Sequence, residues 1–544
     1  MPQYTRRRKY YPKSCSDEMT FEECEMAILR EAIQEGDKEA NQKLINTPDV
    51  RDMISIVEKF ISDHKLVCYG GTAINNILPK KDQFYDLSKE VPDYDFFSKT
   101  ALEHAKQLAD IFYQQGYANI EAKSGVHHGT YKVFVNFIPI ADITQMPEIV
   151  FEAISKESVV VNKIHYCPPN YLRMAMFLEL SRPKGDTTRW EKVLTRLNLL
   201  NKHYPLLSKR ESGECENIPF QRESMNNSDS SEDIFRITRD VLIEDGVVFF
   251  GGYAASIYSK YMPSHLRATH SDDNPDFDVL STDITKTSKK VYKALISSGY
   301  EDVTLVQHRA IGEILPEHIE VRVGNKPIAF IYKPLSCHSY NSVRINDSAD
   351  ESLMGQTIHV ATIDTLLSFY LAFIYSGKEY YHRDRILCIA EFLFELMRKN
   401  RLAQKGLLKR FTMNCYGKAE TLDSIRNKKT RMFNLLKNKK NTQEYEEWFL
   451  KYDPAAIAKK KGLKRNIKTR RVSKPSSGEQ TSTPLEKTEE ITGFEEDEEE
   501  KEKEDEDTDT SSSLPQKQPK RNTKRSNKTA HKSGAAKWLY FILR

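Results

Sequence analysis

LVCYGGTAINNIL at residues 66–78 and VPDYDFF at residues 91–97 are the two segments that decide the fold. The apolar residues before Gly70 and Gly71 predict a buried strand, and the residues from about Thr72 onward predict a helix. Glycines between a strand and a helix let the backbone approach a ligand closely, and a helix N-terminus favours negative charge. The first segment therefore predicts a turn that can hold phosphate groups, although a purely structural tight turn has the same sequence signature.

The second segment predicts a buried strand that carries two carboxylates. Successive side chains of a strand alternate between its faces, so Asp93 and Asp95 project from the same face. Val91 before them and Phe96-Phe97 after them indicate that the strand is buried. Two buried like charges repel each other unless a cation lies between them, and oxygen ligands suit Mg²⁺ or Mn²⁺. The alternatives are a surface turn with acidic caps and the D-x-D motif of metal-dependent glycosyltransferases.

A third carboxylate is predicted on a neighbouring strand. Asp142 lies in the apolar run IADITQMP at residues 140–147, where an unpaired charge is costly, although it could also be the cap of a strand. Nucleotidyl transfer needs backbone N–H groups for a triphosphate, carboxylates for two divalent metals about 4 Å apart, and an in-line hydroxyl. The motifs together therefore predict this chemistry, with Asp142 holding a metal and helping the hydroxyl to lose its proton.

The same pattern occurs a second time in the chain. VVFFGG at residues 247–252 and NPDFDVL at residues 274–280 repeat the glycine pair and the paired aspartates. The spacing from the second glycine to the first aspartate is 22 residues in the first copy and 24 in the second. The spacing from the second aspartate to a Gly-Tyr pair is 21 residues in both copies. A fourth landmark follows in both copies, IADITQMP at residues 140–147 and IAFIYKP at residues 328–334. Four landmarks in one order predict an internal duplication.

The second copy lacks part of the motif. It keeps Gly251-Gly252, Asp276 and Asp278, but IAFIYKP at residues 328–334 places Phe330 where the first copy has Asp142. Glu320 lies nearby, but using it as the missing carboxylate requires a shift of strand register. We therefore expect one active site, in the first copy, and a mainly structural second copy.

The chain has 544 residues, too many for one core, and 82 basic against 78 acidic residues give a net charge of +4. The acidic residues concentrate late in the chain, which leaves a basic body suited to a polyanion. The eight cysteines are scattered without C-x-x-C spacing, so we expect neither zinc nor a disulfide framework, and a reducing compartment. The N-terminus lacks a secretory apolar run and no stretch has the length of a membrane span, so we expect a soluble intracellular protein without membrane contact.

These patterns predict an α+β fold with two tandem modules, each a mixed sheet with flanking helices, and a disordered charged tail. The expected parts are an N-terminal arm and helix (1–48), a catalytic module with a helical extension (49–204), a linker (205–232), a degenerate module (233–400), a basic helical region (401–455) and the tail (456–544).

The motifs YGGTAINNIL, PDYDFF and IADITQMP, followed by YLRMAMFLELSRP and RWEKVLTRL, resemble the poly(A) polymerase catalytic subunits of large DNA viruses. These enzymes belong to the polymerase-β-like nucleotidyltransferase superfamily, and the poxvirus, asfarvirus and giant-virus types share the pattern. The resemblance covers about residues 50–400. It implies a metal-dependent transfer of AMP from ATP to mRNA 3′ ends. Carried over, Gly70 and Gly71 hold the triphosphate, and Asp93, Asp95 and Asp142 bind Mg²⁺ or Mn²⁺. The position of Thr72 after the glycine pair predicts a further hydroxyl contact to the triphosphate.

The resemblance also implies partners and a location. The giant-virus type is similar to a self-sufficient homodimer, so we expect a homodimer that binds ATP and a single-stranded RNA 3′ end. Other viral mRNA-processing proteins are further expected partners, and the expected location is the host cytoplasm, at the viral factory, and the virion.

Several features leave other interpretations open. Basic residues in the helices after the first motif set could contact RNA or nucleotide, or form a solvated face: Arg173, Arg182, Lys184, Arg189 and Lys192. The sequence does not expose the contacts that select a base, so a terminal uridylyltransferase and a CCA-adding enzyme remain alternatives. A non-catalytic RNA-binding scaffold is a third alternative, disfavoured by the intact carboxylates of the first copy.

Overall fold

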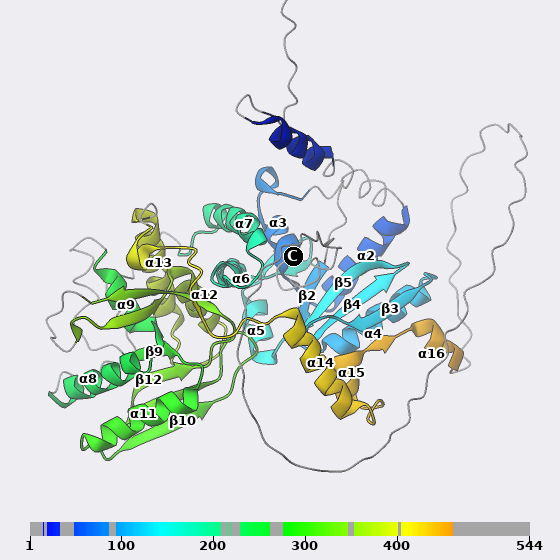
Figure 1. The fold of residues 1–544 in the computed structure, drawn as a ribbon. Coiled ribbons are helices and arrows are strands. Elements are labelled where there is room, and N and C mark those ends of the chain that lie inside the picture. Colours follow the sequence, from blue (N-terminus) through cyan, green and yellow to red (C-terminus); the bar gives the residue numbers. More distant parts are fainter. Residues whose placement is uncertain are drawn as a thin grey trace, which may run out of the picture. The chain divides into compact units, whose positions relative to one another are not determined.

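The computed structural model describes residues 15, 19–32, 48–85, 94–207, 215, 218, 229–261, 276–345, 353–400 and 404–460. In these residues the strands form two mixed sheets of eight strands each, with helices packed against them (Figure 1). The predicted α+β fold with two tandem modules is confirmed. Within the described ranges, no helix is long and apolar enough to span a membrane.

The first module begins with a long amphipathic helix and builds its sheet from strands that are mostly buried. Its helices are α2 (Pro48–Asp63), α3 (Gly70–Ile77), α4 (Ala101–Gln114), α5 (Glu148–Lys156), α6 (Pro169–Leu180) and α7 (Trp190–His203). Its strands are β1 (Val67–Cys68), β2 (Tyr94–Ser98), β3 (Ile120–Ser124), β4 (Thr130–Val135), β5 (Ile138–Gln145), β6 (Val159–Val161) and β7 (Ile164–Tyr166).

The second module repeats this order of elements, with one exception. Its helices are α8 (Asp229–Glu244), α9 (Gly251–Ser259), α11 (Ile284–Ser297), α12 (Ile363–Phe373) and α13 (Arg383–Lys399). Its strands are β8 (Val248–Phe250), β9 (Phe277–Leu280), β10 (Val303–His308), β11 (His318–Val323), β12 (Lys326–Tyr332), β13 (His338–Arg344) and β14 (Thr357–Ala361). No helix corresponding to α5 lies in the described segment between β12 and β13.

The two sheets have the same topology over seven strands. The order is β3-β4-β5-β2-β1-β7-β6 in the first module and β10-β11-β12-β9-β8-β14-β13 in the second. Corresponding neighbours also run in the same relative directions, since β2 is parallel to β5 and β9 is parallel to β12. The duplication predicted from the sequence is therefore confirmed in the fold.

Helices cover one face of each sheet and join the modules. In the first module α2 and α4 pack on one face, and α8 and α11 do the same in the second (Figure 1). All described residues fall into one contact unit, and α6 of the first module packs extensively against α12 of the second. Because α12 is buried along its whole length, this contact is part of the core.

A C-terminal strap, defined here as residues 415–460, adds one strand to each sheet. It begins with β15 (Cys415–Tyr416), which pairs with β13 of the second module. It then forms α14 (Leu422–Leu436) and α15 (Gln443–Phe449), and β16 (Lys451–Tyr452) pairs with β3 of the first module. The strap ends in α16 (Pro454–Lys460), which packs against α4. One continuous segment thus contacts both modules.

The expectation that the cysteines form no disulfides is wrong. All eight cysteines lie in the described part of the chain, and three disulfides join Cys15 to Cys24, Cys215 to Cys388 and Cys337 to Cys415. The sequence separations of the last two pairs are 173 and 78 residues, so only folding brings these partners together. Cys68 and Cys167 are buried free thiols, and burial raises the pKa of both.

The predicted start of the charged tail at residue 456 is too early. Helix α16 continues to Lys460, because Pro454 occupies its first turn and the carboxylate of Asp453 accepts hydrogen bonds from the N–H groups of Ala455 (2.8 Å) and Ala456 (3.1 Å). The rest of the predicted tail, residues 461–544, lies outside the described residues.

Candidate active site

The paired glycines of the first module begin helix α3. Tyr69 is extended and its N–H donates to the carbonyl oxygen of Asp95 at 2.9 Å, which ties the end of β1 to β2. Gly70 follows with φ of +75°, a left-handed conformation that favours glycine. The helix therefore starts at Gly70, two residues before the position expected from the sequence. Gly70, Gly71 and Thr72 are all buried at its N-terminus.

Asp95 and Asp142 are direct register partners on the adjacent parallel strands β2 and β5. Both are almost inaccessible, with exposed fractions of 0% and 1%. Because parallel strands in register place partner side chains on one face, the two carboxylates lie side by side, as the sequence predicts. Asp93, the third predicted carboxylate, lies outside the described residues.

Sequence reasoning missed Lys132, which completes this row of charges. Lys132 on β4 is the register partner of Asp142, so Asp95, Asp142 and Lys132 occupy three neighbouring strands. Its ammonium nitrogen Nζ lies 2.6 Å from Oδ2 and 2.9 Å from Oδ1 of Asp142, and both side chains are buried. A lysine inside the apolar strand TYKVFV was the available signal, since a buried charge requires a partner.

Three uncharged hydroxyl groups lie next to the buried carboxylates of the site. Burial first, and then the charge of Asp95, raise the pKa of the Tyr69 phenol well above its ordinary value, so this hydroxyl keeps its proton. The Tyr69 hydroxyl forms a hydrogen bond of 2.9 Å with the Thr144 hydroxyl, which lies 3.1 Å from the Thr130 hydroxyl. These contacts fix three side chains that flank the carboxylates: Tyr69 directly after β1, Thr144 on β5 and Thr130 on β4.

An apolar pocket adjoins Gly70, and residues of the second module form part of its lining. The ring of Tyr69 stacks on Phe97 with centroids 4.0 Å apart, and Tyr171 of α6 meets Phe97 edge-on at 5.7 Å. The same pocket is lined by Glu313 and Ile314, from the segment between β10 and β11. The second module thus closes one side of the space next to the predicted phosphate-binding turn.

Among the described residues, no three His, Cys, Asp or Glu side chains gather in a metal-binding group. Asp95 and Asp142 supply two carboxylates, and the position of Asp93 in the sequence puts it two residues before Asp95. Two buried carboxylates on one sheet face, with only oxygen donors, fit Mg²⁺ or Mn²⁺ rather than zinc.

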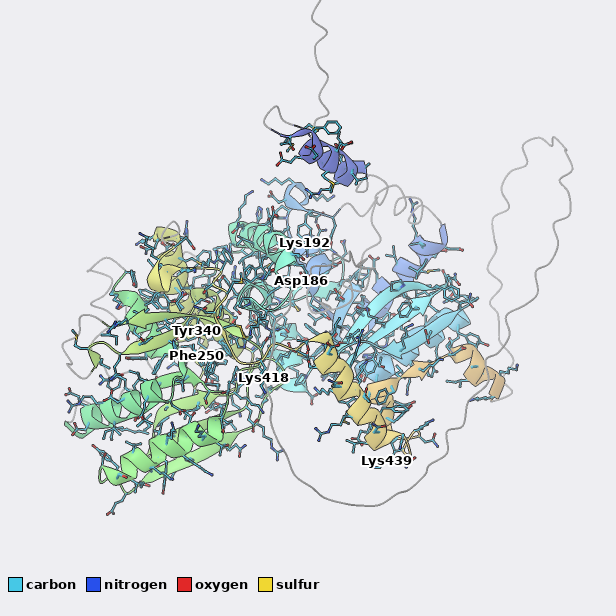
Figure 2. All side chains as sticks on the ribbon, in the orientation of Figure 1. Asp186, Lys192, Phe250, Tyr340, Lys418 and Lys439 are labelled. Atoms are coloured by element: carbon cyan, nitrogen blue, oxygen red, sulfur yellow. A yellow bond between two sulfur atoms is a disulfide. The ribbon has the colours of Figure 1, made fainter. Side chains whose placement is uncertain are left out.

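The basic residues after the first motif set differ from one another in environment. Arg173 is almost fully buried and donates to the side chains of Asn170 and Asn201 and to the carbonyl oxygen of Tyr204, so RNA contact is excluded for it. Apolar residues on both sides of it in α6 explain this burial. Lys184 and Lys192 are exposed (Lys192 is labelled in Figure 2), and RNA contact through them stays a prediction.

The second module has a different arrangement at the equivalent positions. Phe330 is the register partner of Asp278, which confirms the alignment made from the sequence. Glu320 is the partner of Phe330 on the next strand, in the place of Lys132, and pairs with Arg322 (2.7 Å) and His308 (2.9 Å). It therefore does not replace the missing carboxylate.

An aspartate of the second module packs against the glycine turn of the same module. Gly251 has φ of +72°, and a Cβ added to it would lie 2.1 Å from Oδ2 of Asp278. The carboxylate therefore packs directly against the glycine backbone.

Comparisons with known proteins agree with this geometry. Residues 55–186 match the family model described as "Poly(A) polymerase catalytic subunit". A protein of Acanthamoeba polyphaga mimivirus named "Putative poly(A) polymerase catalytic subunit" is 32% identical over 183 residues, 33% of this chain and 31% of that protein. The protein of the same name from African swine fever virus (isolate Pig/Kenya/KEN-50/1950) is 30% identical over 193 residues, 34% of this chain and 40% of that protein.

A solved structure extends the likeness to the whole fold. The crystal structure of the Megavirus polyadenylate synthase matches with a TM-score of 0.64 and 19% identity, over 84% of this chain and 90% of that chain. The fold and the site together define a protein of two tandem modules with the same sheet topology, of which the first carries the paired carboxylates. The resemblance to the catalytic subunits of viral poly(A) polymerases is confirmed, and in sequence it is concentrated in the first module. The chain spans about a third of the length of the mimivirus relative and 40% of the African swine fever virus relative.

Proposed function

We propose that this chain is a template-independent nucleotidyltransferase that transfers AMP from ATP to the 3′ ends of mRNA and releases pyrophosphate. The observation that carries the proposal is the register pairing of buried Asp95 and Asp142 beside the left-handed Gly70. The names of the viral relatives support ATP as the nucleotide and polyadenylation as the outcome.

The N-terminus of α3 is the proposed triphosphate site. Its first N–H groups, at Gly70 and Gly71, have no partners within the helix and are suited to phosphate oxygens. A side chain at Gly70 would be strained at its positive φ. The Thr72 hydroxyl is proposed as a further hydrogen-bond contact to the triphosphate.

Three carboxylates are the proposed metal ligands. Asp95 lies on β2 and Asp142 on β5. Asp93 precedes Asp95 by two residues in the sequence. Bound there, Mg²⁺ or Mn²⁺ supplies Lewis acidity to the α-phosphate and lowers the pKa of the RNA 3′-hydroxyl. Lys132 offsets the charge of Asp142 and holds its carboxylate in one orientation. The site is therefore preorganised for a cation without accumulating three uncompensated negative charges.

In the proposed reaction, the N-terminus of α3 and the carboxylates position the reactants and stabilise charge. The 3′-oxygen of the RNA forms a bond to the α-phosphorus, and the bond to the oxygen that bridges to the β-phosphate breaks. Pyrophosphate leaves from the N–H groups of α3, and the charge of Asp142 favours loss of the hydroxyl proton to water. A nucleophile held in line in this way gains most of its rate from orientation and electrostatics.

Primer extension tests this proposal. The full chain is incubated with a short single-stranded RNA and each nucleoside triphosphate in turn, with Mg²⁺ or Mn²⁺. We expect extension with ATP, and a loss of about 100-fold or more in Asp95→Asn, the near-isosteric change. Extension chiefly with UTP would identify a uridylyltransferase. Addition of C-C-A and nothing more from a mixture of CTP and ATP would identify a CCA-adding enzyme. No extension with any nucleotide would favour the scaffold.

The oligomeric state and location are also proposals. We propose a homodimer that acts in the host cytoplasm and is packaged in the virion, together with other viral mRNA-processing proteins. The viral origin of the relatives supports the location. Light scattering on the purified chain tests the dimer, and a mass of one chain would reject it.

A further inference from the structure

We propose that the exposed face of α14, in the C-terminal strap, is the surface that binds the single-stranded RNA upstream of the reacting 3′ end. This inference rests on the proposed function, because it assigns a binding surface to the RNA substrate. It commits to a single-stranded polyanion with unpaired bases as the occupant of this face.

The charge of this segment is strongly one-sided. Between Asp423 and Glu444 the chain contains seven basic residues and no acidic residue. Six of the seven are exposed: Arg426, Lys428, Arg431, Lys437, Lys439 and Lys440. Figure 2 labels Lys418 and Lys439, which lie just before and just after α14. Three of the six lie on α14, a helix about 22 Å long, and the other three follow its C-terminal end. Such a concentration of cations is the electrostatic pattern expected for a phosphate backbone.

Exposed apolar side chains lie among these charges. Phe433 is 42% exposed and Leu435 is 61% exposed, on a helix whose buried residues are Ile425 and Leu436. The Phe433 ring meets Phe449 of α15 edge-on with centroids 5.6 Å apart, which fixes its orientation. An oriented, exposed aromatic ring beside cations is suited to stacking with a base.

Contacts connect α14 to the strand that carries Lys132. The ammonium of Lys429 donates to the carbonyl oxygen of Gly125 at 2.6 Å, in the turn between β3 and β4. In the same turn, the ring of His128 packs against Trp448 of α15 with centroids 4.1 Å apart. Strand β4 then begins at Thr130, two residues before Lys132. RNA on α14 therefore lies at the rim of the same module as the carboxylates.

The strap is held at both ends, so this surface has a fixed position relative to the carboxylates. Its start is bound to the second module by β15 and the Cys337–Cys415 disulfide. Its end is bound to the first module by β16, and by the Tyr452 hydroxyl, which lies 2.9 Å from Oδ1 of Asp110. A fixed basic surface can hold the RNA while its 3′ end advances after each addition.

RNA binding without ATP or divalent metal tests the inference separately from catalysis. The full chain is titrated against a labelled single-stranded RNA of about 20 nucleotides. In Arg426→Gln/Lys428→Gln/Arg431→Gln we expect affinity to fall at least about 10-fold and the salt dependence to lose about two units of slope. The matched control removes three exposed lysines from α11 of the second module, Lys286→Gln/Lys289→Gln/Lys293→Gln, and should leave both nearly unchanged.

A second pair of variants tests stacking. Phe433→Ser should weaken RNA binding about 5-fold or more without changing its salt dependence, while Leu435→Ser, on the same helix, should not. Asp95→Asn should bind RNA as the unchanged chain does, so a failure of catalysis leaves this inference intact. Equal losses in the α14 and α11 triple variants, or no loss in either, would overturn it.

Discussion

The Lys132 ammonium lies 2.6 Å from the Asp142 carboxylate, and both groups are buried in the sheet of the first module. A buried ion pair contributes little net stability, but removing one partner leaves an uncompensated charge. Lys132 therefore determines whether the chain can keep a carboxylate at this position in the absence of a cation.

Lys132→Met should lower the free energy of unfolding by about 3–5 kcal/mol, because Asp142 then loses its partner. Chemical denaturation or the midpoint of thermal unfolding measures the effect. Lys123→Met on the neighbouring strand β3 is the control, since its ion pair with Glu121 is half-exposed and should matter by about 1 kcal/mol or less. Added Mg²⁺ or Mn²⁺ should restore part of the stability of Lys132→Met. An unchanged stability would show that Asp142 takes up a proton at little cost.

Asp276→Asn/Asp278→Asn should leave nucleotide addition within about threefold of the unchanged chain, because Phe330 removes the third carboxylate from the second module. The comparison is with Asp95→Asn in the same primer-extension assay, after both proteins have been checked for the same thermal midpoint. A loss as large as that in Asp95→Asn would mean that the second module performs chemistry.

Gly251→Ala should destabilise the second module by more than its backbone conformation alone explains. Gly246 also has a positive φ, but an added Cβ there meets nothing within 4 Å, so Gly246→Ala should cost only about 1–2 kcal/mol. At Gly251 the Cβ would collide with Asp278, which adds about 1–3 kcal/mol. Equal unfolding free energies for the two variants would contradict the tight packing of Asp278.

His338 should make stability depend on pH. Burial first, and then the charge of Arg182, lower the pKa of His338 to about 3, while the unfolded chain has an ordinary histidine pKa near ~6.5. Folding favours the neutral ring. Its contribution to the free energy of unfolding is therefore fully present above about pH 6.5 and is lost as the pH falls from there toward 3. In this pH window the free energy of unfolding of the unchanged chain should fall, relative to that of His338→Leu, by up to about 1.4 kcal/mol per pH unit. Parallel unfolding profiles for the two proteins would reject the assignment.

The sequence was sufficient to predict the face of the first sheet that carries Asp95 and Asp142, because its signals are local. Gly70, Asp95 and Asp142 each lie in a short apolar segment whose secondary structure follows from its pattern. The duplicated spacing also aligned Phe330 with Asp142, and the observed pairing of Phe330 with Asp278 agrees with that alignment. Roles for these residues stay predictions until activity is measured.

Features that depend on distant parts of the chain could not be predicted in the same way. The partner of Cys388 is Cys215, 173 residues earlier, and no local pattern specifies such a pair. Strand β16 has two residues between two helices, too short for an alternating pattern to reveal it. Lys132 carried a signal, a charge in an apolar strand, but its partner became evident only when β4 and β5 were paired.

The strap has a consequence for the synthesis of the chain. Tyr452 completes the edge of the first module against Asp110, which lies 342 residues earlier. A ribosome that adds 5–20 residues per second needs on the order of tens of seconds to cover that distance. During this time the edge strand β3 has left the ribosome without the strand that will cover it, and open edges are sites of aberrant pairing. The nascent chain must therefore protect its first module until the last of its described helices has been made.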